Sequence, residues 1–339
     1  MGIALAAVLV MASAAFAQNA GSLRGVVSDP SGGVLPGATV VLLNEATRES
    51  RQVQTDSKGG YFFAAVPPGV YTVRIEMPGF KKAENKAIRM SPNDTKGLDV
   101  TLQVGAQSET VEVTATREII QTETGAREGV IRADQIENLS IISRSPMELL
   151  RILPGVVAPD ARDLESVSNG GGANNTGGYS VNGVRGSNNV ITLDGSRMID
   201  IGSNSGLIIA PNTDFVSEVK VQSSNYAAEF GSGGIQINAI TKGGSSEFHG
   251  SAYSYLRHHK FAANDRSNSI AGVDRPRSKF LYPGANISGP IVIPGTGFNK
   301  NRDKAFFFLG VELWRQDVDT GSIFRVTPTL NQRKGLFTD

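Results

Sequence analysis

Hydrophobic and polar residues alternate with a period of two through much of residues 21–104. In residues 71–76, Tyr, Val and Ile take every second position, with Thr, Arg and Glu between them, and residues 100–104 repeat the alternation. Turn-forming sequences such as Pro-Pro-Gly at 67–69 separate these short segments. Short strands at even spacing predict an antiparallel β-sandwich over residues 21–104.

A mixed pattern follows in residues 125–242 and predicts an α+β domain. Ser-Pro-Met-Glu at 145–148 has the form of a capping box, so Glu148 is interpreted as a helix cap and not as an acid catalyst. Pro154 and Gly155 are expected to end this helix. Residues 169–178 hold five Gly and three Asn without the Gly-Lys-Ser/Thr ending of a phosphate loop, which predicts a plain loop.

The same region also contains strand patterns. Strands are expected in residues 179–184, 189–193, 215–221 and 234–241. In the third of these, Val219 and Val221 alternate with Glu218, Lys220 and Gln222. This alternation predicts a sheet with one face in a polar environment.

Residues 243–339 contain longer alternating segments of about ten residues, which are typical of transmembrane β-barrel strands. In residues 304–314, every second residue is apolar, while Gly310 and Glu312 fall on the other face, and residues 285–293 alternate in a similar way. Any one of these segments could equally be a sandwich strand. Several in succession favour the first strands of an antiparallel barrel, and the chain is therefore expected to be mainly β.

Composition narrows the possible chemistry. The 339 residues include no Cys and only three His, which excludes disulfides and thiolate metal sites and leaves little material for a catalytic triad. We therefore expect no metal, no cofactor and no catalytic residue. The formal net charge of +1 argues against a nucleic-acid partner, which needs a clustered basic surface.

The N-terminal residues 1–17 form a short apolar stretch that ends in Ala-Phe-Ala. Such a stretch is too short for a comfortable transmembrane helix and predicts a secretory signal peptide, with a buried N-terminal strand or helix as the alternative. The positive residues that usually precede the apolar part are missing, so the true start is left open. The mature chain is expected to be exported.

Four motifs in residues 21–104 carry a specific resemblance. They are Leu-Arg-Gly-Val-Val-Ser-Asp at 23–29, Pro-Gly-Ala-Thr-Val at 36–40, Thr-Asp-Ser-Lys-Gly-Gly-Tyr-Phe at 55–62 and Pro-Gly-Val-Tyr-Thr-Val at 68–73. The segment resembles the carboxypeptidase regulatory-like domain, which implies a transthyretin-like, carbohydrate-binding-like sandwich and an accessory, non-enzymatic role. Tyr61, Tyr71 and Phe80 could stack on a sugar or pack in the core.

Residues 105–124 are interpreted as a linker. Their alternating part is similar to a TonB box and consists of Glu109, Thr110, Val111, Glu112, Val113, Thr114 and Ala115. A segment of this kind can add as a strand to an exposed sheet edge, where backbone hydrogen bonds supply the affinity. A plain linker, or the last strand of the sandwich, is the other interpretation.

The second half of the chain resembles the TonB-dependent outer-membrane receptors of the Oar-like type. The residues that match the plug signature are Asn182, Gly183, Arg185, Gly186, Asp194 and Gly195. Residues 219–231 and 238–250 are similar to the end of the plug and the first barrel strand. Residues 138–144 depart from the family, because they lack its frequent Leu-Pro-x-x-Gly-Arg sequence.

This resemblance implies a fold, a place and partners. The fold is a transthyretin-like β-sandwich, an α+β plug domain over 125–242, and the first strands of a transmembrane antiparallel β-barrel over 243–339. That barrel is incomplete, and the sequence is expected to be an N-terminal fragment. The implied function is energised uptake at the cell outer membrane, with a periplasmic N-terminal domain. Its partners would be TonB, outer-membrane lipid and a polysaccharide or peptide substrate. The alternative is an exported carbohydrate-binding or surface-adhesion protein.

Overall fold

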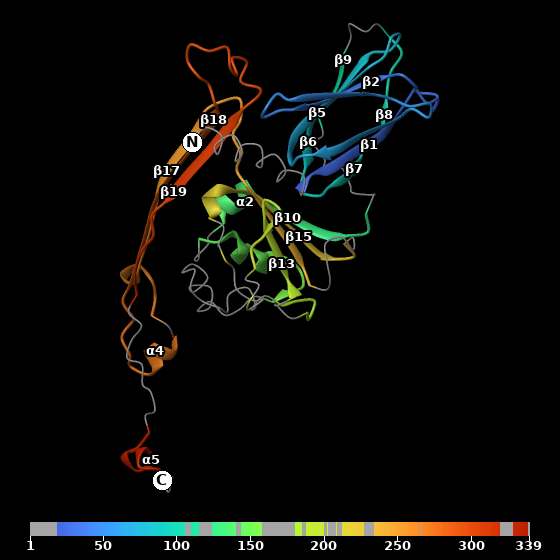
Figure 1. The fold of residues 1–339 in the computed structure, drawn as a ribbon. Coiled ribbons are helices and arrows are strands. Elements are labelled where there is room, and N and C mark those ends of the chain that lie inside the picture. The colour runs from blue at the N-terminus through green and yellow to red at the C-terminus, as the bar shows by residue number, and fades with distance from the viewer. Residues whose placement is uncertain are drawn as a thin grey trace. The chain divides into compact units, whose positions relative to one another are not determined.

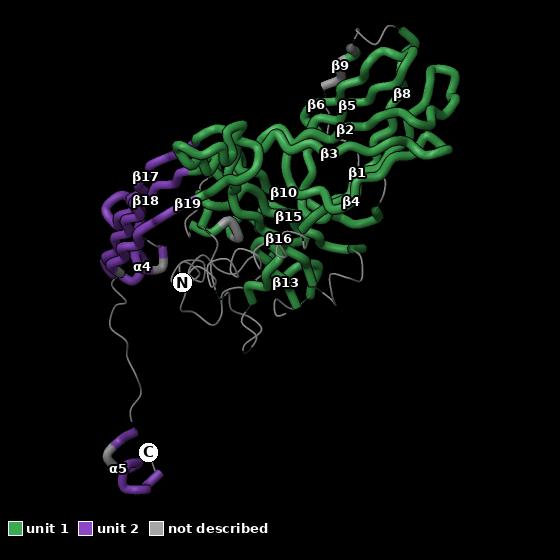
Figure 2. The backbone as a smooth tube through the Cα atoms, turned by 45° about the horizontal axis from the view of Figure 1, so that its top comes forward, with its two compact units in different colours: residues 1–248, 288–308 green, residues 249–287, 309–339 purple. Residues whose placement is uncertain are grey.

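The computed structural model describes residues 19–105, 110–114, 124–139, 144–157, 180–184, 188–199, 202, 208, 212–226, 234–264, 266–318 and 328–337. The chain divides into two compact units, shown in different colours in Figure 2. The first unit comprises residues 1–248 and 288–308, and the second comprises residues 249–287 and 309–339. Residues 1–17, the expected signal peptide, and the loop expected at 169–178 lie outside the described residues.

The N-terminal part of the first unit is a sandwich of two sheets (Figure 1). One sheet has four strands: β1 (Gly21–Ser28), β4 (Gly60–Val66), β7 (Thr95–Gly97) and β8 (Val100–Thr101). The other has the order β3-β2-β5-β6-β9, with β2 (Thr39–Asn44), β3 (Ser50–Gln54), β5 (Gly69–Glu76), β6 (Lys82–Met90) and β9 (Thr110–Thr114). The predicted sandwich is confirmed. The expectation that it is antiparallel throughout is wrong, because β1 pairs in parallel with β7 and β8, and β6 pairs in parallel with β9.

One hydrophobic core lies between these two sheets and includes Leu23, Phe63, Val40 and Ile75. Tyr61 and Tyr71 are buried in it, and their hydroxyls donate to the carbonyls of Leu98 at 2.6 Å and Pro67 at 2.8 Å. Phe80 packs against the same core. The rings of Tyr61 and Tyr71 therefore serve core packing and are not open to a sugar, while Phe80 is half-buried at the edge of the core.

The plug region of the first unit contains a five-stranded sheet with the order β10-β15-β16-β13-β14. Its strands are β10 (Arg127–Arg132), β13 (Val190–Leu193), β14 (Ser196–Arg197), β15 (Val216–Ser224) and β16 (Gln236–Thr241). Strands β11 (Val156–Val157) and β12 (Ser180–Val181) form a separate two-stranded sheet and come between β10 and β13 in the chain. Helix α2 (Ala133–Asn138) follows β10 directly. The mixed α+β expectation is confirmed, although strand 179–184 is shortened to β12.

The helix expected after Ser145 is a 3₁₀ helix, η2 (Pro146–Ile152). The backbone N–H of Glu148 donates to the carbonyl of Ser145 at 3.1 Å, the three-residue spacing of that helix type. Leu149 and Leu150 are buried in the core of the plug region, and Gly155 follows with a positive φ of 80°. Two buried leucines on a single short helix thus anchor this segment to the sheet.

The central strands β15 and β16 of the plug sheet are buried on both faces, so the face expected in a polar environment is polar but closed to solvent. Val219 and Val221 belong to the hydrophobic core, as the alternation predicts. Glu218, Lys220 and Gln222 on the opposite face are also buried, with exposed fractions of 6%, 1% and 4%. The polar side chains therefore face other protein groups and not solvent.

The C-terminal sheet has the order β17-β18-β19, and β20 pairs with β18. Its strands are β17 (His249–His258), β18 (Ser278–Pro290), β19 (Phe306–Glu312) and β20 (Arg315–Val318), and the short helices of this region are α4 (Arg266–Ile270) and α5 (Leu330–Arg333). In β19, Leu309 and Val311 are exposed by 66% and 58%, whereas Gly310 and Glu312 are half-buried. This outward apolar face agrees with the alternation and with strands made to face lipid.

Within the described ranges, no helix has the length and apolar character needed to span a bilayer.

Phe62 and Phe63 offer a direct test of the sandwich core, because they are neighbours on β4 with exposed fractions of 56% and 1%. Phe63→Ala should lower the free energy of unfolding of the sandwich by about 3–5 kcal/mol, since it leaves a cavity. Phe62→Ala should change it by no more than about 0.5 kcal/mol. Urea unfolding followed by hydrogen exchange of β1 and β4 measures both, and equal losses would contradict this packing.

Candidate functional site

The segment similar to a TonB box lies on the sandwich as strand β9. Thr110 to Thr114 pair in parallel with Lys82 to Lys86 of β6, residue by residue. The other two residues of the segment, Glu109 and Ala115, lie outside the described residues. The structure thus shows that the segment can form a strand at a sheet edge, and that in this state it is the last strand of the sandwich.

Strand β9 covers one edge of β6, whose other edge pairs with β5. It is the final strand in the order of its sheet, so its own outer edge has no strand partner in the described part of the chain. Val111 is half-buried there, in register with Ala83. The segment therefore has one occupied and one open hydrogen-bonding edge.

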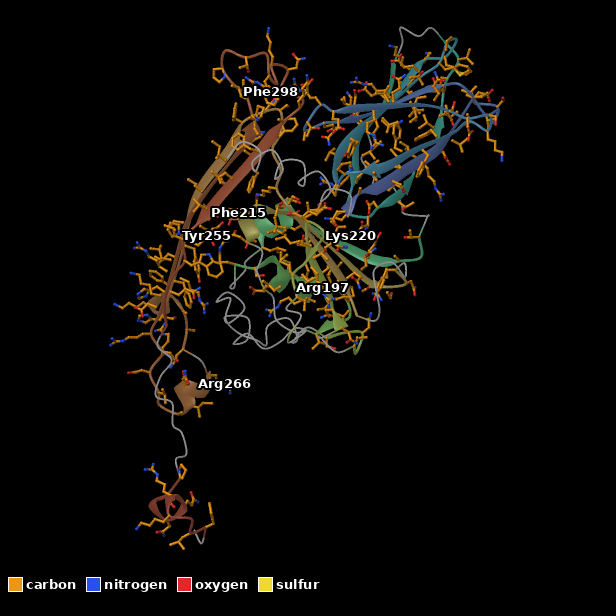
Figure 3. All side chains as sticks on the ribbon, in the orientation of Figure 1. Arg197, Phe215, Lys220, Tyr255, Arg266 and Phe298 are labelled. Carbon is orange, nitrogen blue, oxygen red and sulfur yellow. The ribbon has the colours of Figure 1, made fainter. Side chains whose placement is uncertain are left out.

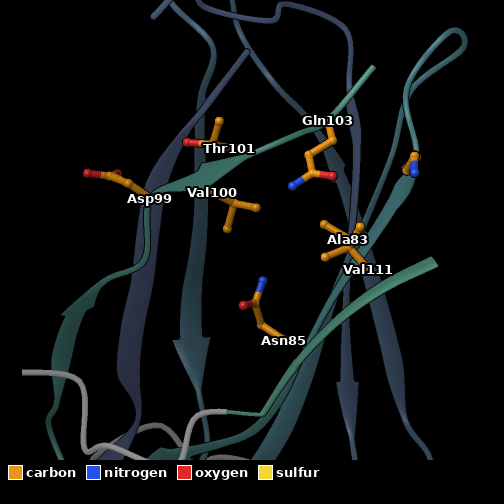
Figure 4. A pocket seen from close by; sticks show the side chains of 8 residues that line it. Ala83, Asn85, Asp99, Val100, Thr101, Gln103 and Val111 are labelled. Carbon is orange, nitrogen blue, oxygen red and sulfur yellow. The ribbon is translucent and has the colours of Figure 1, made fainter. Parts of the chain in front are cut away.

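A cavity of about 190 Å³ lies beside β9, between it and the segment that follows β7 (Figure 4). Its lining consists of Lys81, Ala83, Asn85, Asp99, Val100, Thr101, Gln103 and Val111. Figure 4 shows Ala83 and Val111 side by side at its wall. Every lining residue is non-aromatic, so the cavity lacks a stacking surface for a sugar ring.

Asn182 and Gly183 of the plug signature form a tight turn after β12. Both have positive φ, 52° and 78°, a conformation for which Asn and Gly are the favoured residues. The amide Nδ2 of Asn182 donates to the carbonyl of Ser223 at 3.2 Å, which ties this turn to the end of β15. Arg185 and Gly186, the next signature residues, lie outside the described residues.

Asp194 and Gly195 form the turn between β13 and β14, again with positive φ, 50° and 82°. The carboxylate of Asp194 accepts hydrogen bonds from the backbone N–H and the hydroxyl of Thr241, at 2.9 and 2.8 Å. The signature residues that the structure describes thus hold turns and join strands of the plug.

Sequence reasoning missed a buried charge cluster centred on Lys220 of β15, labelled in Figure 3. Its ammonium Nζ lies 2.6 Å from Oδ1 of Asp94 and 2.8 Å from Oε2 of Glu128. Asp94 belongs to the turn between β6 and β7, and Glu128 belongs to β10, so one lysine joins the sandwich to two strands of the plug sheet. The alternating pattern around Lys220 looks the same for a solvent-facing lysine, which is why it gave no signal.

Glu218 lies on the same face of β15, two residues from Lys220. Burial raises the pKa of the Glu218 carboxyl, and the negative charge of Asp94 adds to the rise, while a hydrogen bond with Ser91 acts against it. A carboxyl in this position is held partly toward its neutral form. The contact between sandwich and plug is therefore sensitive to charge.

In the part of the chain that the structure describes, no group of three or more His, Cys, Asp or Glu residues is placed to hold a metal ion.

Replacing Lys220 tests the charge cluster. Lys220→Met should lower the free energy of unfolding of the plug region by about 3–5 kcal/mol, because it leaves two buried carboxylates without their cation. Hydrogen exchange of β15 as a function of urea measures the loss.

The matched control is Lys242→Met. The Lys242 ion pair with Glu137, at 3.0 Å, is partly exposed on both sides, so the expected loss is at most about 1 kcal/mol. Similar losses for the two variants would show that Lys220 does not hold the cluster together.

Glu218 gives a prediction about pH. Because the folded state raises its pKa, folding takes up a proton, and the free energy of unfolding falls as pH rises from the ordinary glutamate value of 4.5 through the raised one. Glu218→Gln removes this titration, so the variant should gain stability relative to the unsubstituted chain as the pH rises above 4.5. Urea unfolding as a function of pH measures the difference, with Glu137→Gln as the exposed control. Parallel pH profiles for Glu218→Gln and the unsubstituted chain would contradict the burial of a charged carboxyl.

Three families of known domains match this chain in the order of the sandwich, the plug and the barrel strands. Family models match the carboxypeptidase regulatory-like domain at residues 22–103, the TonB-dependent receptor plug domain at 121–236 and the outer membrane beta barrel domain at 240–339. The TonB-dependent transporter Oar of Myxococcus xanthus is 29% identical over 322 residues, or 91% of this chain. The chain spans 28% of the length of that relative.

Two solved structures are similar to parts of the chain. The siderophore receptor PirA from Acinetobacter baumannii has 21% identity and a TM-score of 0.36, covering 49% of this chain and 22% of the receptor. The ferric enterobactin receptor of Pseudomonas aeruginosa has 17% identity and a TM-score of 0.38, covering 58% of this chain and 26% of that one.

A sandwich, a plug and the first barrel strands are thus matched in order by three family models, and a transporter matches across most of the chain. Proteins with these domains are located in the outer membrane. The chain belongs to the TonB-dependent outer-membrane receptors of the Oar-like type, with an N-terminal carboxypeptidase regulatory-like domain.

Proposed function

We propose that this chain is part of a receptor for energised uptake across the outer membrane, and that residues 109–115 are the segment that TonB binds. The observation that supports this role is the pairing of β9 with β6, since it places the segment in a conformation suited to strand addition. The proposed division is a signal peptide at 1–17, the sandwich at 21–104, a linker at 105–124, the plug at 125–242 and the barrel from 243.

In this proposal the plug blocks the barrel until cargo binds on the outside. The polar face of its sheet supports such a movable role, because Glu218, Gln222, Gln236 and Asn238 are buried there among polar neighbours. A polar contact can be exchanged for water or for another polar contact without exposing apolar surface. The face is thus better suited to rearrangement than a close-packed hydrophobic face.

Energy for the rearrangement would come from the inner membrane through TonB. One elementary charge that crosses the membrane releases about 2.3 kcal/mol per 100 mV. TonB would pair with the 109–115 segment through backbone hydrogen bonds and transmit force to the plug, whose first strand β10 begins at Arg127. No bond is made or broken in the cargo, and no residue of the chain acts as a catalyst.

Cargo binding by the sandwich is the alternative role. The aromatic residues that could bind a polysaccharide, Tyr61 and Tyr71, are both only 4% exposed. Their burial argues against a glycan-binding or adhesive role at this position, and a polysaccharide or peptide cargo would then meet other parts of the receptor.

Crosslinking tests the TonB contact in the full-length receptor. A photoreactive residue at Val111 or Val113 should form an adduct with TonB in cells, because both positions belong to the paired segment. The control position is Gln54 of β3, which is the strand at the opposite edge of the same sheet. Absence of TonB adducts at Val111 and Val113 would remove the proposed role of the segment.

A further inference from the structure

We propose that the sandwich domain is a competitor of TonB: its strand β6 holds the 110–114 segment at rest, and TonB binds the segment only when β9 has left β6. This inference rests on the function proposed above and adds a regulatory role for the N-terminal domain. It gives the accessory sandwich a task, which is to set how often the segment is available.

Strands β6 and β9 pair in one defined register over the whole length of β9. All five residues of β9 have a partner in β6, from Lys82 with Thr110 to Lys86 with Thr114. Val111 and Ala83 are register partners and line the same cavity, so the valine side chain points between the two sheets. The sandwich thus fixes both the register of the segment and the face that it turns inward.

Connectivity favours this pairing over an encounter with another molecule. Strand β9 starts at Thr110, a few residues after Val104, which forms an isolated bridge with Phe80 next to β6. A short tether keeps the local concentration of the segment at β6 high, so an incoming strand must compete with an intramolecular partner. At rest the segment should therefore be mostly bound.

The sandwich is in turn held on the plug, through the buried contact between Asp94 and Lys220. Strand β9 therefore pairs with a domain that is itself in contact with the plug. To extend away from the plug toward a distant partner, it must leave β6 or the sandwich must leave the plug. We expect β9 to yield first, because only a few backbone hydrogen bonds hold a five-residue parallel pair at a sheet edge.

The competing possibility is addition of the TonB strand at the open outer edge of β9, with β9 still on β6. A strand directs alternate backbone groups to its two edges, so this mode would use groups that β6 leaves free. The two modes differ in one respect: only competition requires β9 to separate from β6.

A disulfide between β6 and β9 distinguishes them, and the chain has no Cys to interfere. The full-length receptor with Ala83→Cys and Val111→Cys carries a photoreactive residue at Val113, and TonB adducts are measured in cells with and without an oxidant. Register partners on parallel strands lie within the range that a disulfide spans. Oxidation should reduce the TonB adduct at least about tenfold, and dithiothreitol should restore it.

Matched controls isolate the effect of the bridge. Val41→Cys with Gln52→Cys joins register partners of β2 and β3 within the same sheet, and oxidation of this pair should leave the adduct unchanged. Each single variant, Ala83→Cys or Val111→Cys, should also be insensitive to oxidant.

Each result decides something definite. A TonB adduct that persists in the fully bridged receptor would overturn competition and show that TonB uses the outer edge of β9. Failure of Ala83→Cys and Val111→Cys to form a bridge, while the β2–β3 pair does, would show that β9 does not rest on β6 and would also overturn the inference. Absence of the adduct in the reduced receptor, and also in the receptor that carries only the photoreactive residue at Val113, would instead count against the proposed function.

Discussion

The free edge of strand β6 determines how the sandwich sheet is completed. Backbone N–H and C=O groups at such an edge need partners, and an open edge is a template for another strand. In the sandwich, β6 has β5 on one side and β9 on the other, so the 110–114 segment satisfies an edge that its absence would expose. The same property makes the segment available to a partner protein, because a strand that pairs with one sheet edge can also pair with the edge of another sheet.

A second constraint is the buried ammonium of Lys220. A lysine that is 1% exposed is stable only with its charge compensated, and Asp94 and Glu128 supply two carboxylates within 2.8 Å. Because one carboxylate comes from the sandwich and the other from the plug, the compensation is complete only when the domains are together. Glu218 adds a carboxyl whose burial is costly when it is charged, so the contact combines attraction with a pH-dependent cost. Such an interface is specific without being strongly hydrophobic.

The sequence was informative where structure is local and less so where partners are distant. Alternation in residues 71–76 predicts β5 and its buried face, since adjacent side chains of a strand point to opposite sides. The positive φ of Asn182 and Asp194 is typical of the residue types at those turns. By contrast, the parallel pairing of β9 with β6 is not encoded by a local turn, and a five-residue alternating segment is compatible with a linker, a last strand or a docking strand. Lys220 and Gln222 fit a solvent-facing pattern equally well, and only the tertiary contact with Asp94 shows that this face is buried.

The strength of the β9 pairing determines whether competition is physically reasonable. A parallel pair of five residues supplies a few backbone hydrogen bonds, each with a net contribution of about 0.5–1.5 kcal/mol, so the hold amounts to only a few kcal/mol. That is comparable with the roughly 2.3 kcal/mol per 100 mV available from one charge that crosses the inner membrane. A hold of this size is strong enough to keep a tethered segment on β6 most of the time, because a free energy of 1.4 kcal/mol already corresponds to about a tenfold population ratio. It is also weak enough for a partner that forms an equivalent strand pair to replace it. The sandwich, an accessory domain, can then control access to the segment because the two share a sheet edge.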